Sequence, residues 1–74
     1  MLTQLLGRRI ATLRKRSGFT QEQFAEAAEY SVEFISLVER GVNSPTVAGI
    51  EKMAKVLKVE PRDFFTFEAK EEPK

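Results

Sequence analysis

The first apolar residues of the chain recur at helical spacing. Leu6, Ile10 and Leu13 are separated by four and three positions, so they share one face of a helix. This spacing predicts a helix from residue 3 to about residue 16. Gly7 lies inside that helix, where glycine costs about 1 kcal/mol relative to alanine, and we expect it to mark a close approach to another helix.

The next stretch carries the signals of a helix start. Thr20 suits the N-cap position, and Gln23, three positions later, completes a capping box. Phe19 and Phe24 flank the cap with the spacing of a hydrophobic staple. These features predict a short helix over residues 21–28.

A second helix start follows closely. Ser31 is an N-cap candidate, and Gly41 supplies the left-handed residue that commonly ends a helix. We therefore predict a helix over about residues 32–40, joined to the preceding helix by a turn at residues 29–31.

A fourth helix follows a loop of turn-forming residues at 41–45. Thr46 is its N-cap candidate, and Met53 is expected to fill a gap in the core. Its other apolar positions form one stripe at helical spacing: Val47, Ile50, Ala54 and Leu57.

Pro61 fits the first position of a short fifth helix, which Phe64 or Phe65 anchors on the core. Residues 68–74 are charged and lack large apolar side chains, which predicts a disordered tail. Residues 1–67 then form one domain of the all-α class, a compact five-helix bundle. Its predicted core is Leu6, Ile10, Leu13, Phe24, Ala25, Ala28, Ile35, Val38, Val47, Ile50, Ala54 and Leu57.

The amino-acid composition excludes several kinds of chemical site. The 74 residues include no Cys and no His, so disulfides, thiolate metal sites and the commonest general base are excluded. The glutamates are spaced as solvated helix faces, without a nucleophile beside a base. We therefore predict that the chain is not an enzyme and has no cofactor, metal or small-molecule ligand. No apolar run approaches the roughly 20 residues of a membrane span, and we expect a cytoplasmic protein.

Charge is unevenly distributed, although the net charge is only +1. The first 20 residues hold five basic and no acidic side chains, and the next 20 hold five acidic and one basic. A basic first helix suits a phosphate backbone, but the same charges can simply cover a solvent-facing surface. The plain interpretation of Arg8, Arg9, Lys15 and Arg16 is solvated helix surface.

Residues 31–41 carry the signature S-x-x-x-I-S-x-x-E-R-G. The apolar positions that accompany it are Phe24, Ala25, Ala28, Tyr30, Ile35 and Val38. In these residues the chain resembles the helix-turn-helix domain of phage repressors, Cro proteins and Xre-type bacterial regulators, over roughly residues 6 to 65. The resemblance implies a phage-repressor type of bundle with a central helix-turn-helix. One departure is Glu29, because the family usually has Gly at this place in the turn.

The resemblance also implies an ion pair between Arg14 and Glu39, the glutamate of E-R-G. In similar domains this pair ties the first helix to the end of the second motif helix. The alternative is two separate surface charges.

In similar domains the second motif helix enters the major groove of DNA, with its N-terminal half against the bases. Its outward positions here lack the Gln, Asn and Arg side chains that bind purines through two hydrogen bonds. Val32 and Leu37 suit thymine methyl groups, and Glu33 can accept a hydrogen bond from a cytosine amino group. Phe34 faces either the turn or the groove. Base contacts are assigned to Val32, Glu33, Ser36 and Leu37.

Phosphate contacts follow from the same resemblance, because helix N-termini and the loop after the second motif helix face the DNA backbone in similar domains. The residues at these places are Gln21, Ser31, Arg40 and Asn43.

We therefore predict a sequence-specific DNA-binding transcriptional regulator whose partner is double-stranded DNA. The alternative on the same fold is a protein-interaction module, an antirepressor or a dimerisation partner, because an exposed apolar and acidic helix also suits protein binding. Similar regulators bind as two-fold dimers, and we expect a homodimer formed through the domain itself. Three phenylalanines lie near the end of the domain, which is more than a short helix can bury in its own core. We therefore assign Phe65 and Phe67, with Val59, to the dimer interface. The alternative is that all three cover the core of one subunit.

Overall fold

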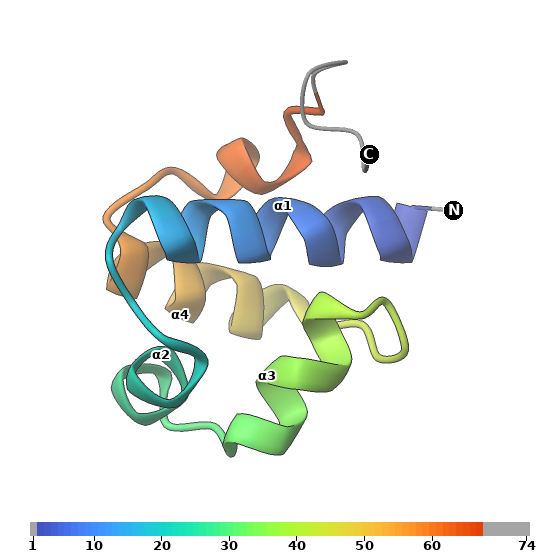
Figure 1. Cartoon of the computed structure of the whole chain (residues 1–74). Helices are drawn as coiled ribbons and strands as arrows, with labels where there is room; N and C mark the ends of the chain where they lie inside the picture. Colours follow the sequence, from blue (N-terminus) through green and yellow to red (C-terminus); the bar gives the residue numbers. More distant parts are fainter. Residues whose placement is uncertain (1, 68–74) are drawn as a thin grey trace.

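The computed structural model describes residues 2–67 and shows four α-helices followed by a 3-10 helix (Figure 1). The bounds are α1 (Leu2–Arg16), α2 (Gln21–Ala28), α3 (Val32–Glu39), α4 (Val47–Leu57) and the 3-10 helix (Pro61–Phe65). The predicted all-α class is confirmed, whereas the predicted fifth helix is a 3-10 helix of five residues rather than an α-helix. The predicted tail at 68–74 lies outside the described residues.

α1 runs through the middle of the molecule (Figure 1). It contacts α3 on one side and the 3-10 helix on the other, and α2 packs beside α3. α3 and the 3-10 helix are therefore separated by α1. Between residues 2 and 67, no helix combines the length and the apolar character that crossing a membrane requires.

The helices begin where the sequence predicts because polar side chains cap them. The hydroxyl of Thr20 accepts a hydrogen bond from the backbone N–H of Gln23 at 3.0 Å, and the Gln23 side chain accepts one from the N–H of Thr20 at 2.9 Å. Ser31 caps α3 by accepting from the N–H of Phe34 at 3.0 Å. Thr46 caps α4 in the same way. Each cap satisfies an N–H group that the first turn of a helix leaves without a partner.

All four α-helices end at a residue in the left-handed region. The N–H group after that residue donates to a carbonyl of the last turn at 2.8–3.1 Å, which is the Schellman pattern. Two of these residues are glycines, Gly18 and Gly41, but Glu29 and Lys58 have φ values of +63° and +60°. A side chain in this region costs about 1 kcal/mol. The turn between α2 and α3 is therefore closed by a residue that is intrinsically unfavourable there.

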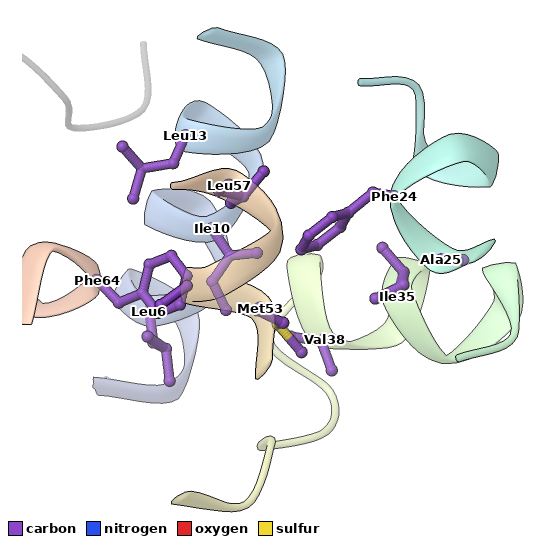
Figure 2. Packing of buried hydrophobic residues seen from close by; sticks show 11 residues of the cluster. Leu6, Ile10, Leu13, Phe24, Ala25, Ile35, Val38, Met53, Leu57 and Phe64 are labelled. Atoms are coloured by element: carbon purple, nitrogen blue, oxygen red, sulfur yellow. The ribbon is translucent and has the colours of Figure 1, made fainter. Parts of the chain in front are cut away.

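The core draws side chains from every helix (Figure 2). Val47 was expected in this core and is 77% exposed, so that prediction is wrong. The buried side of α4 is centred on Met53 and Leu57 rather than on the stripe that begins at Val47, and Ile50 is half-buried at its edge. The buried apolar residues are Leu6, Ile10, Leu13, Phe24, Ala25, Ala28, Ile35, Val38, Met53, Ala54, Leu57 and Phe64.

Gly7 marks the predicted close approach, which brings α1 against the end of α3. A Cβ at this position would clash with the carbonyl oxygen of Val38 and would lie 2.8 Å from that of Glu39. Both contacts are with backbone atoms, which cannot swing away as a side chain can. The absence of a side chain at Gly7 therefore allows the two helices to touch.

Arg9 is not on the solvated surface, contrary to the plain interpretation of its sequence. It is buried, and its Nε donates to the carbonyl oxygen of Asp63 in the 3-10 helix at 2.7 Å. The reason is that the 3-10 helix covers a second side of α1, with Phe64 fully buried beneath it. Arg9 thus links α1 to the C-terminal segment of the domain.

Candidate nucleic-acid interface

α3 presents one face to solvent because its opposite face enters the core. Ile35 and Val38 are buried, whereas Val32 and Glu33 are exposed. Ser36 and Leu37, one turn further along, are half-buried. Positions 32, 33, 36 and 37 adjoin on a helix surface, so the four residues predicted to contact bases share one outward face. We call these four residues the outward face of α3.

Phe34 does not belong to this face. Its ring lies 4.8 Å from that of Tyr30, centroid to centroid, and it packs against the core cluster. The sequence left open whether Phe34 faces the turn or the groove, and in the structure it faces the turn. The outward face therefore has two aliphatic side chains, one hydroxyl and one carboxylate, and its only charge is negative.

The end of α3 is tied to both α1 and α2. Arg14 donates to Glu39 through Nε at 2.6 Å and through its second nitrogen, Nη2, at 3.1 Å, and the two side chains are 9% and 6% exposed. The remaining guanidinium nitrogen donates to the carbonyl oxygen of Phe19 at 2.8 Å. Gln21, at the start of α2, donates its side-chain amide to the same carboxylate at 2.9 Å. The alternative of two separate surface charges is therefore wrong.

α2, the turn at residues 29–31 and α3 form a helix-turn-helix. The sequence model of a family described as "Helix-turn-helix domain" matches residues 5–64 of the chain. The chain belongs to the helix-turn-helix family. Its resemblance to phage-repressor and Xre-type regulators is thereby confirmed.

Several relatives of this helix-turn-helix protein are named as regulators. The uncharacterized HTH-type transcriptional regulator YazB of Bacillus subtilis (strain 168) is 42% identical over 59 residues, which are 80% of this chain and 86% of the relative. Control protein C.BamHI of Bacillus amyloliquefaciens is 33% identical over 64 residues, 85% and 79% of the two chains. The crystal structure of the restriction-modification controller protein C.AhdI from Aeromonas hydrophila superposes with a TM-score of 0.82 at 32% identity, covering 85% of this chain and 96% of that one.

The residues assigned to phosphate contacts lie at both ends of α3 of this helix-turn-helix protein. Gln21 reaches the C-terminal end through its bond to Glu39, and Arg40 directly follows α3 and is exposed. Ser31 lies at the opposite end as the N-cap. Its hydroxyl accepts from a backbone N–H, as a cap does, and can still donate. The backbone N–H of Asn43, in the loop after α3, donates to the carbonyl oxygen of Leu37 at 3.4 Å, so Asn43 also lies at the C-terminal end. The four residues therefore form two groups rather than one cluster.

The side chain of Gln21 has a second role that the sequence did not indicate. One of its two amide N–H bonds is engaged by Glu39, which leaves one for any other acceptor. The N–H groups at the start of α2 are unaffected by this bond.

The three C-terminal phenylalanines divide between the core and the surface. Phe64 is fully buried, while Phe65 and Phe67 are 44% and 38% exposed. The two exposed rings meet edge to face, with their centroids 6.5 Å apart. Val59 is half-buried against the core. Phe65 ends the 3-10 helix and Phe67 follows it closely. α1 separates the 3-10 helix from α3 (Figure 1).

The contacts between the motif turn and α4 were not predicted from the sequence. Tyr30 lies against Gly49 and Lys52, and Lys52 also reaches Glu29. One signal was available, because Gly49, like Gly7, is a glycine inside a helix and thus a candidate for close approach. Nothing in the sequence pattern, however, indicated which residue approaches it.

Proposed function

We propose that this chain binds an operator as a two-fold dimer and reads it with α3 in the major groove. As a member of the helix-turn-helix family, the chain is a DNA-binding transcriptional regulator. The observation that carries the finer proposal is the bond network around Glu39, which holds α3 against α1 and α2 while its outward face stays free. An α-helix fits the major groove, which is about 12 Å wide, and a fixed helix presents its side chains in one register.

Base recognition in this proposal relies on pyrimidine edges. Val32 and Leu37 offer aliphatic surface to thymine methyl groups, and the Glu33 carboxylate accepts a hydrogen bond from a cytosine amino group. Ser36 has a hydroxyl that can donate or accept. The outward face has no amide or guanidinium group, so it cannot bind a purine through two hydrogen bonds as Gln, Asn or Arg does.

Backbone contacts in this proposal come from the two ends of α3 and the loop that follows it. Arg40 brings a positive charge, Asn43 an amide, and Ser31 a hydroxyl. Gln21 contributes its free amide N–H together with the N–H groups that begin α2. These contacts fix the position of the protein on the duplex and contribute no sequence preference.

The dimer is proposed because one small domain touches too few base pairs for useful selectivity. Two copies related by a two-fold axis contact half-sites about 34 Å apart. Phe65 and Phe67, with Val59 at the edge, are the proposed isologous contact, since two neighbouring aromatic rings are exposed there. α1 separates this surface from α3, so dimerisation leaves the recognition helix uncovered.

The test has two stages that use the same protein. Binding to a random-sequence duplex is measured over a range of salt concentrations, where we expect log K to fall linearly with log salt as phosphate-bound counterions are released. Selection from a random DNA pool then reports the preferred sequence, for which we expect two related half-sites. A protein without measurable affinity for duplex DNA at low salt would refute the proposal.

A second function is favoured by one specific observation. The outward face of α3 combines the exposed Val32 with the negatively charged Glu33, which is unusual for a surface that approaches phosphates. The same fold would then act as a protein-interaction module, an antirepressor or a dimerisation partner. Its expected signature is the absence of salt-dependent DNA binding, together with retained folding.

A further inference from the structure

Tyr30, the residue that precedes the N-cap of α3, contacts residues of both α3 and α4. Its ring packs against that of Phe34 with the centroids 4.8 Å apart and the planes inclined by 33°. The Nζ of Lys52, from α4, lies 5.0 Å from the centre of the Tyr30 ring, within the range of a cation–π contact. Tyr30 thus joins the first turn of α3 to α4.

Gly49 of α4 makes room for the Tyr30 hydroxyl. A Cβ at this position would lie 2.6 Å from that hydroxyl oxygen and 3.3 Å from the hydroxyl of Thr46. The backbone of Gly49 is ordinary helix, so glycine is needed here for space and not for its φ. A methyl group at this position has to displace Tyr30, whose ring is already confined by Phe34 and Lys52.

Lys52 also contacts the residue that closes the turn. Its Nζ lies 3.6 Å from a carboxylate oxygen of Glu29, the residue with φ +63°. Because the side chains of Lys52 and Glu29 are 43% and 81% exposed, this ion pair by itself adds little to stability. Its location matters more, since Lys52 touches Glu29 and Tyr30, which are consecutive residues of the turn.

We propose that Tyr30 is a positioning residue for sequence recognition, through which α4 sets the direction of the first turn of α3. A shift of the Tyr30 ring moves Phe34, and Phe34 lies directly after Val32 and Glu33 on α3. The other end of α3 is held separately by the bonds of Glu39. Displacing Tyr30 therefore tilts the base-reading end of the helix and leaves its anchored end in place.

The role proposed for Tyr30 is tested through DNA affinity, so it rests on the proposed function. Gly49→Ala is the central variant. Alanine in place of glycine inside a helix normally stabilises it, so unfolding is not the expected effect. We expect affinity for the selected operator to fall by about tenfold relative to affinity for random duplex, which is the loss of roughly one good base contact. Phosphate contacts keep random-duplex binding close to that of the parent protein.

Tyr30→Phe provides the rescue, because it removes the hydroxyl and keeps the ring. Alone, it should leave the operator-to-random affinity ratio unchanged. Combined with Gly49→Ala, it should restore most of that ratio, since the added methyl group then has space. A double variant as impaired as Gly49→Ala would show that the hydroxyl contact is not the cause and would overturn the inference.

A matched lysine pair tests α4 independently, even if Gly49→Ala fails to fold. Lys52→Ala and Lys55→Ala each remove one exposed positive charge from α4, but only Lys52 contacts the turn. We expect Lys52→Ala to lower the operator-to-random ratio by about threefold or more, and Lys55→Ala to leave it unchanged. Equal ratios for the two variants would overturn the inference. If the parent protein binds no DNA at all, the proposed function itself fails, which is a distinct result.

Discussion

Arg14 and Glu39 are joined by two hydrogen bonds across the contact between α1 and α3. The same carboxylate also receives the amide of Gln21, so one side chain connects three helices. A buried charge with its partners removed is costly, whereas a complete pair is tolerated. Glu39 therefore determines where α3 ends against the body of the domain, and the outward face of α3 follows from that placement.

Glu39→Ala should destabilise the domain more than any other glutamate-to-alanine change in α2 or α3. It leaves the Arg14 guanidinium buried without its carboxylate, a loss of about 3–5 kcal/mol in the free energy of unfolding. Denaturant midpoints measure the difference. Exposed glutamates give the matched controls, which should shift by about 0.5 kcal/mol or less: Glu22, Glu26 and Glu33. A midpoint for Glu39→Ala among those of the controls would contradict a stabilising network.

Glu29→Gly should stabilise the turn by up to about 1 kcal/mol, because glycine adopts a positive φ without a steric penalty. Lys58→Gly is the matched comparison, since Lys58 ends α4 with nearly the same φ of +60°. Glu29→Gly also removes the exposed contact with Lys52, so its gain should be smaller by a few tenths of a kcal/mol. Thermal unfolding midpoints of both variants measure the two gains. A larger gain for Glu29→Gly would mean that the Lys52 contact does not support the turn.

The helices were largely predictable because their signals are local. Thr20 and Gln23 are three residues apart and determine the start of α2 whatever lies elsewhere. The end of α3 follows from Gly41 in the same way, since its Schellman bonds involve only neighbouring residues. These elements depend on contacts within a single turn, and the sequence contains all of them.

Burial was less predictable because it depends on which faces other elements cover. Arg9 and Arg8 look alike in the sequence, but the 3-10 helix covers Arg9. Val47 fits the apolar stripe of α4, yet α4 is rotated so that Met53 faces inward. The same difference between local and distant contacts holds at the site. The outward face of α3 follows from the helical period and was predictable. The contact of Tyr30 with α4 depends on the packing of two distant segments and was not.

Asn43→Ala should weaken binding to all DNA sequences alike and leave the selected motif unchanged, because a phosphate contact carries no base information. Gln21→Ala should do the same, with an added loss of stability from its bond to Glu39. Binding to the selected operator and to random duplex is compared at one salt concentration. A changed base preference in Asn43→Ala would show that its side chain reads a base.

Glu33→Gln should change the preference at one base pair in each half-site, since it replaces an acceptor of the cytosine amino group with an amide. The discrimination at that position should change by about 1–3 kcal/mol. It should also tighten nonspecific binding by removing a negative charge near the phosphates. Glu26→Gln is the control, because Glu26 is exposed on α2 and its change alters the same charge outside the outward face of α3. An unchanged motif from the random pool would exclude the cytosine contact.

Phe67→Ser should weaken the dimer while the domain remains folded. The reason is that Phe65 and Phe67 expose neighbouring rings, whereas Phe64 alone anchors the 3-10 helix in the core. Sedimentation over a range of protein concentrations compares this variant with the parent protein, and Leu2→Ser is the control, because Leu2 is an exposed apolar residue outside the proposed contact. We expect a raised dissociation constant for Phe67→Ser only, together with weaker binding to DNA that carries two half-sites. A parent protein that stays monomeric at high micromolar concentration, even on such DNA, would rule out the dimer.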